Sequence, residues 1–422
     1  MNKPATLPAY SMELPLMRQH FHIPLDAHGQ PVRYFCGNSL GLMPRNARAL
    51  VEEVLDAWAR EGVEGHFKGS APWMPYHELV REPLAELVGA QPSEVVAMNT
   101  LTVNLHLMLA SFYTPNPRRY KILLEARAFP SDRHALVSKL RMHGFSAEQA
   151  LVELSPEPGE ACLRPEAVEA AITEHGEQLA LVLMPGVQYA TGQAFDLAAI
   201  SSAAHAVGAL AGFDLAHAVG NLPLALHDSG ADFAVWCSYK YLNSGPGAVA
   251  GCFVHARHAE TDRPRLAGWW GHRADTRFRM GPEFVATPGA DGWQLSNPPI
   301  LSMAPLRASL ALFQQATMPA LRARSLLLTG ALEASLKSDL ANHLEILTPA
   351  DPQQRGCQLS LRVRAGQGAG RAAFDALAQA GIIADWREPD VIRVAPAPLY
   401  NTLDDVDALS EALRGHFSGA RR

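Results

Sequence analysis

The chain has 422 residues, of which 48% are hydrophobic and 18% are charged, and its formal net charge is −6 at pH 7. These values are typical of a soluble globular enzyme with a substantial core, and they exclude a strongly basic surface that would attract nucleic acid. Because no apolar run of about 18 residues and no secretory signal occur, we expect no membrane partner and a cytoplasmic location.

Short strands alternate with helices in the first two thirds of the predicted structure. Residues 1–33 are expected to form an arm or a short helix packed on the main body. We expect strands at 120–125, 179–184, 209–215, 232–239 and 251–254, and helices at 131–142, 165–173 and 197–207. This βαβ rhythm indicates a mostly parallel sheet covered on both faces. A TIM barrel would show the same rhythm, so periodicity alone leaves both architectures open.

A smaller α+β domain is predicted in the C-terminal part of the chain. A stretch rich in Ala and Leu at 304–337 predicts one long linking helix. Strands are expected at 344–347, 357–363, 382–386 and 391–394, and helices near 372–380 and 404–417. A barrel does not explain this lobe. The predicted division is an N-terminal arm or helical segment at 1–60 that contributes to the small domain, a large α/β domain at 61–310 and a small domain at 311–422.

Asp214 and Lys240 carry the strongest chemical signal. Both fall at or near the carboxyl end of a predicted strand, where open α/β sheets bind ligands. A carboxylate there can keep a pyridine nitrogen protonated, and a lysine one strand away can form an imine with an aldehyde on the same ring. Pyridoxal phosphate (PLP) requires this pair. Taken singly, Asp214 could cap a strand end and Lys240 could be a solvated surface residue, but the flanking Tyr239 and Tyr241 favour a nucleophilic lysine.

Two further segments and a histidine could serve the same site. A helix that runs to about Tyr113 is predicted to begin near Asn99, Thr100 or Thr102, and its first amide groups could bind a phosphate or simply be capped. Phe129 could stack on a flat ligand, or it could be a core residue before a Ser N-cap. His217, three residues after Asp214, could be a ligand of the site or a packed core histidine.

Arg393 and a pair of tryptophans are candidates for substrate or interface contacts. Arg393, on a predicted C-terminal strand, could bind an amino-acid carboxylate through two hydrogen bonds, or it could be paired across the domain interface. Trp269 and Trp270 lie in a loop flanked by glycines. An exposed tryptophan in a loop favours an interface or a ligand role.

The cysteines and histidine pairs predict neither disulfides nor a metal site. The five cysteines are widely spread and lack CxxC spacing. The pairs His20/His22 and His255/His258 have no third ligand nearby in the sequence, so we expect them at the surface.

Five motifs, in order along the chain, resemble the kynureninase family. They are Gly37–Gly41 (GNSLG), Asp214–Gly220 (DLAHAVG), Cys237–Asn243 (CSYKYLN), Gly268–His272 (GWWGH) and Arg393–Asn401 (RVAPAPLYN). The resemblance extends from about residue 34 to residue 410 and is therefore more specific than any single motif. Kynureninases are PLP enzymes of the aspartate aminotransferase fold (fold type I). The resemblance implies a large domain with a mostly parallel central sheet and a smaller α+β C-terminal domain.

The resemblance also implies roles for individual residues. The implied PLP-binding residues are Leu101, Thr102, Phe129, Asp132, Asp214, His217, Tyr239, Lys240, Trp269 and Asn297. Lys240, Tyr239 and Asp214 are implied to be catalytic, and the substrate is expected to contact Ser39, His66, Asn297 and Arg393. The family residue matching Asn297 comes from the facing subunit, which implies a homodimer with shared sites. Trp270 departs from the phenylalanine expected at its position.

The implied reaction is hydrolysis of L-kynurenine or 3-hydroxy-L-kynurenine to alanine and an anthranilate, in tryptophan breakdown or NAD biosynthesis. His66 and Asn297 predict a preference for the hydroxylated substrate, because family members that act on it tend to carry these residues. A cysteine desulfurase or selenocysteine lyase is an alternative, but it needs a reactive cysteine in a mobile C-terminal loop, and Cys357 opens a predicted strand. A catalytically silent PLP-fold binding protein is a second alternative, although it would not need Lys240, Asp214 and Arg393 together.

Overall fold

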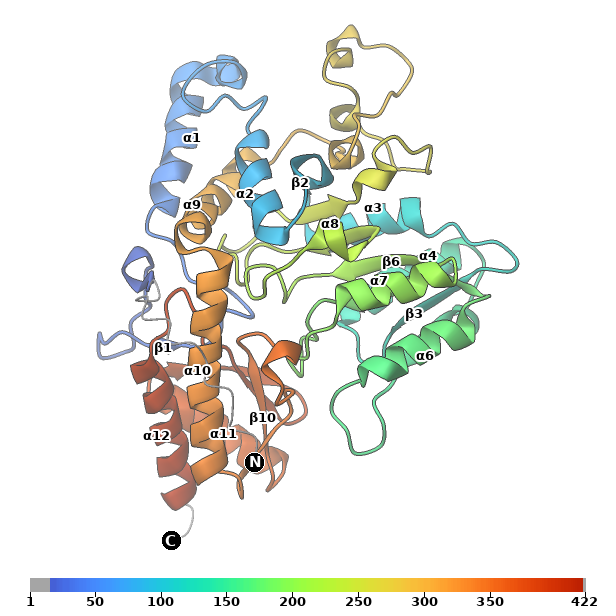
Figure 1. Ribbon diagram of the computed structural model, residues 1–422. Helices are drawn as coiled ribbons and strands as arrows, with labels where there is room; N and C mark the ends of the chain where they lie inside the picture. The colour runs from blue at the N-terminus through green and yellow to red at the C-terminus, as the bar shows by residue number, and fades with distance from the viewer. Residues whose placement is uncertain (1–15, 420–422) are drawn as a thin grey trace, which may run out of the picture.

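The computed structural model describes residues 16–419, and a seven-stranded sheet lies at the centre of its larger part (Figure 1). In sheet order the strands are β2 (Val95–Ala97), β8 (Gly251–Val254), β7 (Phe233–Trp236), β6 (Leu210–Asp214), β5 (Leu179–Pro185), β3 (Lys121–Glu125) and β4 (Leu151–Leu154). β8 is antiparallel to both of its neighbours, and all other neighbouring pairs are parallel. The prediction of a mostly parallel sheet is confirmed. Because the sheet is open, with β2 and β4 at its edges, the barrel is excluded.

Alternate residues of the strands point into two different hydrophobic cores. Ile122 and Leu124 of β3 belong to one core, whereas Leu123 between them belongs to the other. This alternation is expected when helices cover both faces of a parallel sheet. The helices of this region are α3 (Leu101–Phe112), α4 (Pro130–Met142), α5 (Ala147–Ala150), α6 (Pro165–His175), α7 (Leu197–Ala206) and α8 (Leu226–Ser229).

The C-terminal lobe, orange to red in Figure 1, has its own sheet and its own core. Its strands lie in the order β12 (Asp385–Arg387), β13 (Val391–Val394), β10 (Leu359–Val363) and β9 (Leu344–Ile346), and neighbours are antiparallel. The helices are α10 (Met318–Asp339), α11 (Gln367–Gln379) and α12 (Leu403–Gly419). Leu332, Leu361 and Ile392 are among the core residues that join the helices to the sheet. The small α+β domain is thus observed as predicted.

Residues 16–94 bridge the two parts of the molecule. β1 (Arg33–Tyr34) pairs in parallel with β11 (Ile382–Ile383) of the C-terminal lobe. α1 (Ala47–Glu61) and α2 (Glu78–Val88) instead pack against α9 (Ile300–Ala316), as the blue and orange helices of Figure 1 show. Residues 1–15 of the predicted arm lie outside the described residues. The boundaries after residues 60 and 310 stay predictions, and the second of them falls within α9.

Three predicted elements differ from those observed. The single helix at 304–337 is wrong, because the chain turns at Thr317 (φ 63°) and α10 starts anew with Pro319 in its first turn. The strand at 382–386 is divided into β11 and β12. The strand at 232–239 ends earlier, since β7 stops at Trp236, so Lys240 lies in the following loop rather than at the strand end.

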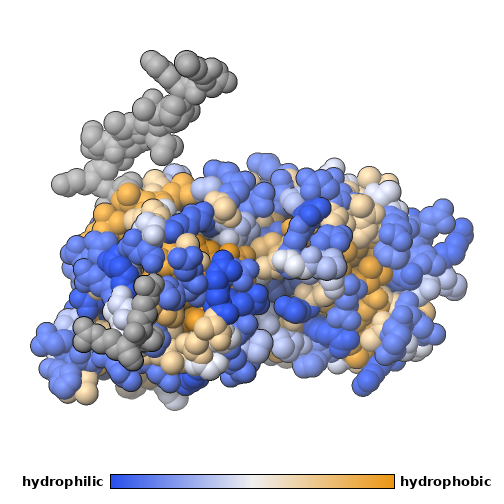
Figure 2. Space-filling view, turned by 90° about the horizontal axis from the view of Figure 1, so that it is seen from below, coloured by the Kyte–Doolittle hydropathy of each residue, from blue (hydrophilic) through white to orange (hydrophobic). Residues whose placement is uncertain are grey.

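The surface carries both polar and apolar residues. Figure 2 shows that the face seen from below is mostly hydrophilic, with separate apolar patches between the polar residues. In the part of the chain that the structure describes, no helix combines the length and the apolar character needed to cross a bilayer.

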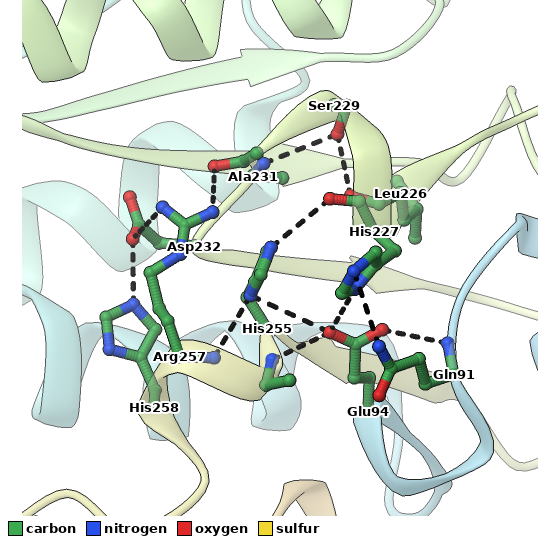
Figure 3. Close-up of polar contacts among 12 residues, drawn as sticks. Gln91, Glu94, Leu226, His227, Ser229, Ala231, Asp232, His255, Arg257 and His258 are labelled. Carbon is green, nitrogen blue, oxygen red and sulfur yellow. Dashed lines mark hydrogen bonds and ion pairs between the residues drawn. The ribbon is translucent and has the colours of Figure 1, made fainter.

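A hydrogen-bonded cluster of histidine and carboxylate side chains lies at the edge of the large sheet where β8 ends. It joins the chain segments 91–94, 226–232 and 255–258 (Figure 3). Glu94 accepts hydrogen bonds from His227 Nδ1 at 2.8 Å, from the Ala256 N–H at 2.7 Å and from the Gln91 N–H at 2.8 Å. His255 Nδ1 accepts the Arg257 N–H at 3.1 Å. Ligand atoms of Glu94, His227 and His255 lie within 4.8 Å of one another, but these hydrogen bonds already account for the cluster.

The predicted surface location of the His255/His258 pair is therefore wrong. His258 is buried and its Nε2 lies 2.8 Å from Asp232 Oδ1, while His255 is largely covered and has Glu94 and His227 as neighbours. The His-x-x-His spacing is explained by two separate carboxylates, one for each ring. These pairs fasten η4 (Ala256–His258) to the strands beside it.

Candidate active site

A pocket opens at the carboxyl ends of β3, β5 and β6, beside the first turn of α3. Parallel α/β sheets bind ligands at this edge. The lining residues include eight of the residues implied to bind PLP: Leu101, Thr102, Phe129, Asp132, Asp214, His217, Tyr239 and Lys240. They are joined by Glu125, Ser131, Pro185, Val187, Tyr189 and Ala216. Residues from five separate segments of the chain thus meet in one pocket.

Lys240 enters this pocket from the loop that follows β7. Its Nζ lies 3.0 Å from His217 Nε2 and 5.7 Å from the centroid of the Phe129 ring. The GNSLG segment supports the loop from the other side, because the Gly41 N–H donates to the Tyr239 carbonyl at 2.8 Å. A Cβ at Gly41 would lie only 2.3 Å from the Lys240 carbonyl oxygen. Glycine is therefore required for this close approach of the two loops.

Three carboxyl groups line the same pocket. Asp214 is the last residue of β6, and its Oδ1 accepts the Ala216 N–H at 2.7 Å. Burial and the adjacent charge of Asp214 raise the pKa of Asp132 well above its ordinary value. Burial also raises the pKa of Glu125, at the end of β3, to about 8. Burial also raises the pKa of Asp214, while its contact with Asp132 and the charge of Lys240 act against that rise. Two buried carboxyl groups side by side favour a single negative charge shared between them.

His217 is a neutral imidazole in this setting. Burial, and then the positive charge of Lys240, hold the pKa of His217 well below its ordinary value. Since the Lys240 ammonium donates to Nε2, the ring proton lies on Nδ1. Neither His217 Nδ1 nor Asp132 Oδ1 has a hydrogen-bond partner among residues 16–419. Buried polar atoms without a partner are costly, so both indicate contact with a bound group.

The first turn of α3 can receive an anion. Thr100 occupies the N-cap position but makes no side-chain cap hydrogen bond. Thr102 Oγ1 lies 2.8 Å from Ser131 Oγ, which brings two hydroxyl groups beside the positive end of the helix. The interpretation as an ordinary side-chain cap is therefore wrong, and the arrangement suits a phosphate.

Phe129 presents a ring to the pocket instead of filling the core. It is 41% exposed, and its ring meets Tyr189 edge-on with centroids 5.3 Å apart. The core interpretation fails, and α4 begins at Pro130, so Ser131 lies inside the first turn instead of capping it. With a lysine, a carboxylate, a helix N-terminus and an exposed aromatic ring in one pocket, these residues fit PLP.

Arg393 lies beside the pocket but does not line it. The side chain is fully buried, with Nη2 bonded to Asp385 and Nη1 donating to the Tyr189 carbonyl at 2.6 Å. Tyr189 is a pocket residue, so Arg393 is connected to the site through one backbone group. The ion pair with Asp385 lies within the C-terminal lobe, so the alternative of a pairing across the domain interface is met only by the hydrogen bond to the Tyr189 carbonyl. Arg393 Nε has no partner among the described residues.

Four residues implied by the resemblance lie elsewhere on the chain. Ser39 is in the GNSLG loop next to the lysine loop, and His66 ends η2 (Gly62–His66) with its ring edge-on to Trp73. Trp269 begins η5 (Trp269–Gly271) and is 40% exposed, and Asn297 is exposed before α9. None of the four lines the pocket of its own chain.

Trp270 corrects one expectation about the tryptophan loop. Its side chain is buried, and the Arg277 guanidinium carbon lies 4.3 Å from the centroid of its ring. Only Trp269 of the pair is substantially exposed. Exposure therefore favours an interface or ligand role for Trp269 alone.

Three of the six additional lining residues are polar and were not predicted from the sequence, although one of them had a visible signal. Glu125 is an acidic residue at the end of a predicted strand, the same position that drew attention to Asp214. Ser131 and Tyr189 carry no such signal. Tyr189 lies in the turn after β5, and only the path of that turn brings it to Phe129 and Arg393.

Known proteins of one family are similar to this chain over most of its length. Residues 321–413 match the family model for the Kynureninase C-terminal domain. A kynureninase from Xanthomonas campestris pv. campestris (strain B100) is 63% identical over 383 residues, covering 91% of this chain and 90% of that protein. A kynureninase from Xanthomonas oryzae pv. oryzae (strain PXO99A) is 62% identical over 373 residues, covering 88% of each chain.

Solved structures with the same fold have much lower sequence identity. An apo cysteine desulfurase from Thermococcus onnurineus NA1 has a TM-score of 0.76 at 17% identity, covering 96% of this chain and 98% of that chain. A mutant of C-DES with glycine covalently linked to the PLP cofactor has a TM-score of 0.76 at 18% identity, covering 91% and 96%. These similarities show the fold of PLP-dependent fold type I enzymes. On the strength of its curated relatives, the chain belongs to the kynureninase family of PLP-dependent hydrolases.

Proposed function

We propose that this enzyme hydrolyses the Cβ–Cγ bond of L-kynurenine and 3-hydroxy-L-kynurenine, giving L-alanine and anthranilate or 3-hydroxyanthranilate. The observation that carries the proposal is the 63% identity to a kynureninase over 91% of the chain. The pocket that contains Lys240, Asp214 and His217 supports it. The reaction would belong to tryptophan breakdown or NAD biosynthesis in the cytoplasm.

Lys240 is the residue proposed to hold the cofactor and to move the α-proton of the substrate. When bound, PLP supplies an electron sink for the electrons released at the α-carbon. The neutral His217 ring, 3.0 Å from Lys240 Nζ, can accept a hydrogen bond from the ammonium group and hold the amine in place. Tyr239 flanks Lys240 in the pocket and is proposed to help bind phosphate and relay protons.

Asp214 and Asp132 are proposed to act as a pair at the ring nitrogen. With one proton shared between these two buried carboxyl groups, the pair would present a single negative charge to the nitrogen. That charge favours a protonated ring. Leu101, Thr102 and the start of α3 are proposed for the phosphate, and Phe129 for the ring face.

Substrate contacts are proposed for Ser39, His66, Asn297 and Arg393. Arg393 would bind the α-carboxylate, which its connection to the pocket through Tyr189 supports. His66 and Asn297 would hydrogen-bond the ring hydroxyl of the substrate, giving a preference for 3-hydroxykynurenine. In support, His66 Nδ1 is buried and has no partner among the described residues. A polar group in this state discriminates against a substrate that lacks the hydroxyl.

A homodimer with shared sites is proposed because His66, Trp269 and Asn297 do not line the pocket of their own chain. Trp269, Phe278 and Met280 are exposed apolar residues of one region, which supports burial against a second copy. Trp269 and Asn297 would complete the PLP site of the facing subunit.

The desulfurase alternative is less well supported than the kynureninase activity. Cys357 is fully buried, and burial raises the pKa of its thiol to about 12. Its backbone N–H also donates to Asn221 Oδ1 at 2.9 Å, which ties the residue into the core. A thiol in this state does not provide the mobile thiolate that a desulfurase needs.

Steady-state assays with both substrates test the proposal. Purified enzyme with PLP should convert both, with the higher kcat/KM for 3-hydroxykynurenine. The double variant His66→Trp and Asn297→Gly should shift the ratio toward kynurenine, while His134→Gln, an exposed histidine on α4, should leave it unchanged. A wild-type enzyme that favours kynurenine would reject the preference, and absence of anthranilate would reject the activity.

Subunit mixing tests the shared site. Lys240→Ala removes the lysine of a site, and Asn297→Ala removes the residue proposed to reach the other site. Hybrids of the two variants should contain one intact site if sites are shared, so mixing should restore activity. Absence of recovery in hybrids shown to form by mass would contradict the arrangement.

A further inference from the structure

One carboxylate lies between two guanidinium groups on the sheet of the C-terminal lobe. Asp385 of β12 is directly opposite Arg393 of β13, and Arg387 lies two residues further along β12 on the same face of the sheet. Asp385 Oδ1 is 3.0 Å from Arg387 Nε, and Asp385 Oδ2 is 3.1 Å from Arg387 Nη2. Oδ2 also accepts from Arg393 Nη2. The three groups together carry one surplus positive charge.

This surplus charge acts on the pocket. Arg393 donates to the carbonyl of the pocket residue Tyr189 at 2.6 Å. The charges of Arg393 and of Arg387 both contribute to the lowered pKa of His217, although burial and Lys240 are the larger causes. Both guanidinium groups are therefore close enough to affect an anion bound beside His217. Arg393 is also fully buried with an unpartnered Nε among the described residues.

Asp385 alone would weaken the attraction of Arg393 for an anion. An aspartate paired with a single arginine has no net charge, so the pair would have little long-range attraction for a carboxylate. Arg387 contacts both oxygens of Asp385 and offsets its charge. Asp385 can then orient Arg393 without cancelling its positive charge.

We propose that Arg387 is a positioning and specificity residue for the α-carboxylate of the substrate, acting through Asp385 on Arg393. The inference rests on the proposed role of Arg393 and extends it to Asp385 and Arg387, which the sequence motifs did not include. Arg387 is 38% exposed, so it contributes charge to the cluster without being part of the buried core.

The test compares Arg387→Gln and Arg387→Lys in the full-length enzyme with PLP. Arg387→Gln should raise KM for L-kynurenine about 10-fold and change kcat less than about 3-fold, because the lost attraction is the same in the ground and transition states. Arg387→Lys should recover most of the affinity, since it restores the charge. Arg362→Gln is the matched control, because Arg362 is 36% exposed on β10 and pairs with Asp390 at 2.9 Å.

A binding experiment separates the effect of the Arg387 charge from a loss of structure in the variant. L-alanine and ethylamine differ only in the carboxylate, and both can be titrated by the absorption of bound PLP without turnover. Arg387→Gln should raise the Kd of L-alanine about 10-fold and leave that of ethylamine unchanged. The binding experiment remains informative if the wild-type enzyme fails to cleave kynurenine. That failure would reject the proposed function but not this inference.

Two outcomes would overturn the inference. Unchanged KM and unchanged alanine affinity in Arg387→Gln would show that Arg387 has no role in carboxylate binding. An equal loss for alanine and ethylamine, or a failure of Arg387→Lys to recover, would show that the residue only maintains the fold.

Discussion

Gly41→Ala should impair catalysis although Gly41 lies outside the pocket. In the wild-type structure a Cβ at this position would lie 2.3 Å from the Lys240 carbonyl oxygen, 2.3 Å from Asn243 Oδ1 and 2.8 Å from Asn243 Cα. Ordinary contacts of this kind begin at 3.4 Å. The lysine loop and the GNSLG loop must therefore separate by about 1 Å to admit one methyl group.

The expected losses of stability and rate follow from the displacement of the Lys240 backbone. Overpacking of this kind costs about 1–3 kcal/mol of stability. A displacement of about 1 Å at a catalytic group can cost about 100-fold in rate. Because the clashing atom belongs to the backbone of Lys240 itself, rotation of a side chain cannot relieve the contact. We expect kcat/KM to fall about 100-fold and the free energy of unfolding to fall by about 2 kcal/mol.

Anthranilate formation and urea unfolding of the PLP-loaded enzyme measure the two effects. Gly330→Ala is the matched control: Gly330 lies inside α10, and a Cβ there would meet no atom within 4 Å. That variant should keep its activity and gain about 0.5–1 kcal/mol, because alanine favours a helix interior over glycine. Wild-type activity and stability in Gly41→Ala would refute the argument from close contact.

Three further predictions concern the pocket itself. Lys240→Ala should retain the circular dichroism of the wild type but lose turnover by several decades, and a variant that still produces anthranilate would disprove the role of this lysine. Asp214→Asn should slow exchange of the substrate α-proton by about 100-fold or more, measured by deuterium incorporation, and an unchanged rate would exclude the ring-nitrogen role. Glu125 has its pKa raised from 4.5 to about 8, so its protonated form stabilises the folded state below about pH 4.5 and this contribution is lost as pH rises to about 8. The unfolding free energy of Glu125→Gln should thus fall less between pH 5 and pH 8 than that of the wild type, and equal slopes would contradict the buried acid.

The central sheet could be predicted from the sequence because strand periodicity is local. Each buried strand of a parallel sheet appears as a short apolar run, and the predicted strands at 120–125, 179–184 and 209–215 lie within a residue or two of the observed strands. The break between α9 and α10 was missed because a run rich in Ala and Leu looks helical throughout, whereas the positive φ of Thr317 depends on how both helices pack.

The chemistry of Asp214 and Lys240 was also readable from the sequence. Asp214 and Lys240 have complementary reactivity and lie at or near the ends of two consecutive predicted strands. Because parallel strands bring their carboxyl ends to one edge of the sheet, the two residues were expected in one site. The roles of Phe129 and Thr102, in contrast, could not be decided from the sequence. A core phenylalanine and a helix cap have the same local sequence as a ring contact and a phosphate site, so only exposure and the absence of a cap hydrogen bond distinguished them.

By itself the sequence determined the order of strands and helices, the lysine and the carboxylate of the pocket, and the family resemblance, because each of these depends on local pattern or residue type. Only the tertiary structure decided that Gly41 meets the lysine loop, that Asp132 and Asp214 are buried side by side in one pocket, and that Arg387 shares Asp385 with Arg393. These contacts join residues of separate loops and strands. The protonation states depend on burial and on neighbouring charge, and both exist only once the chain has folded.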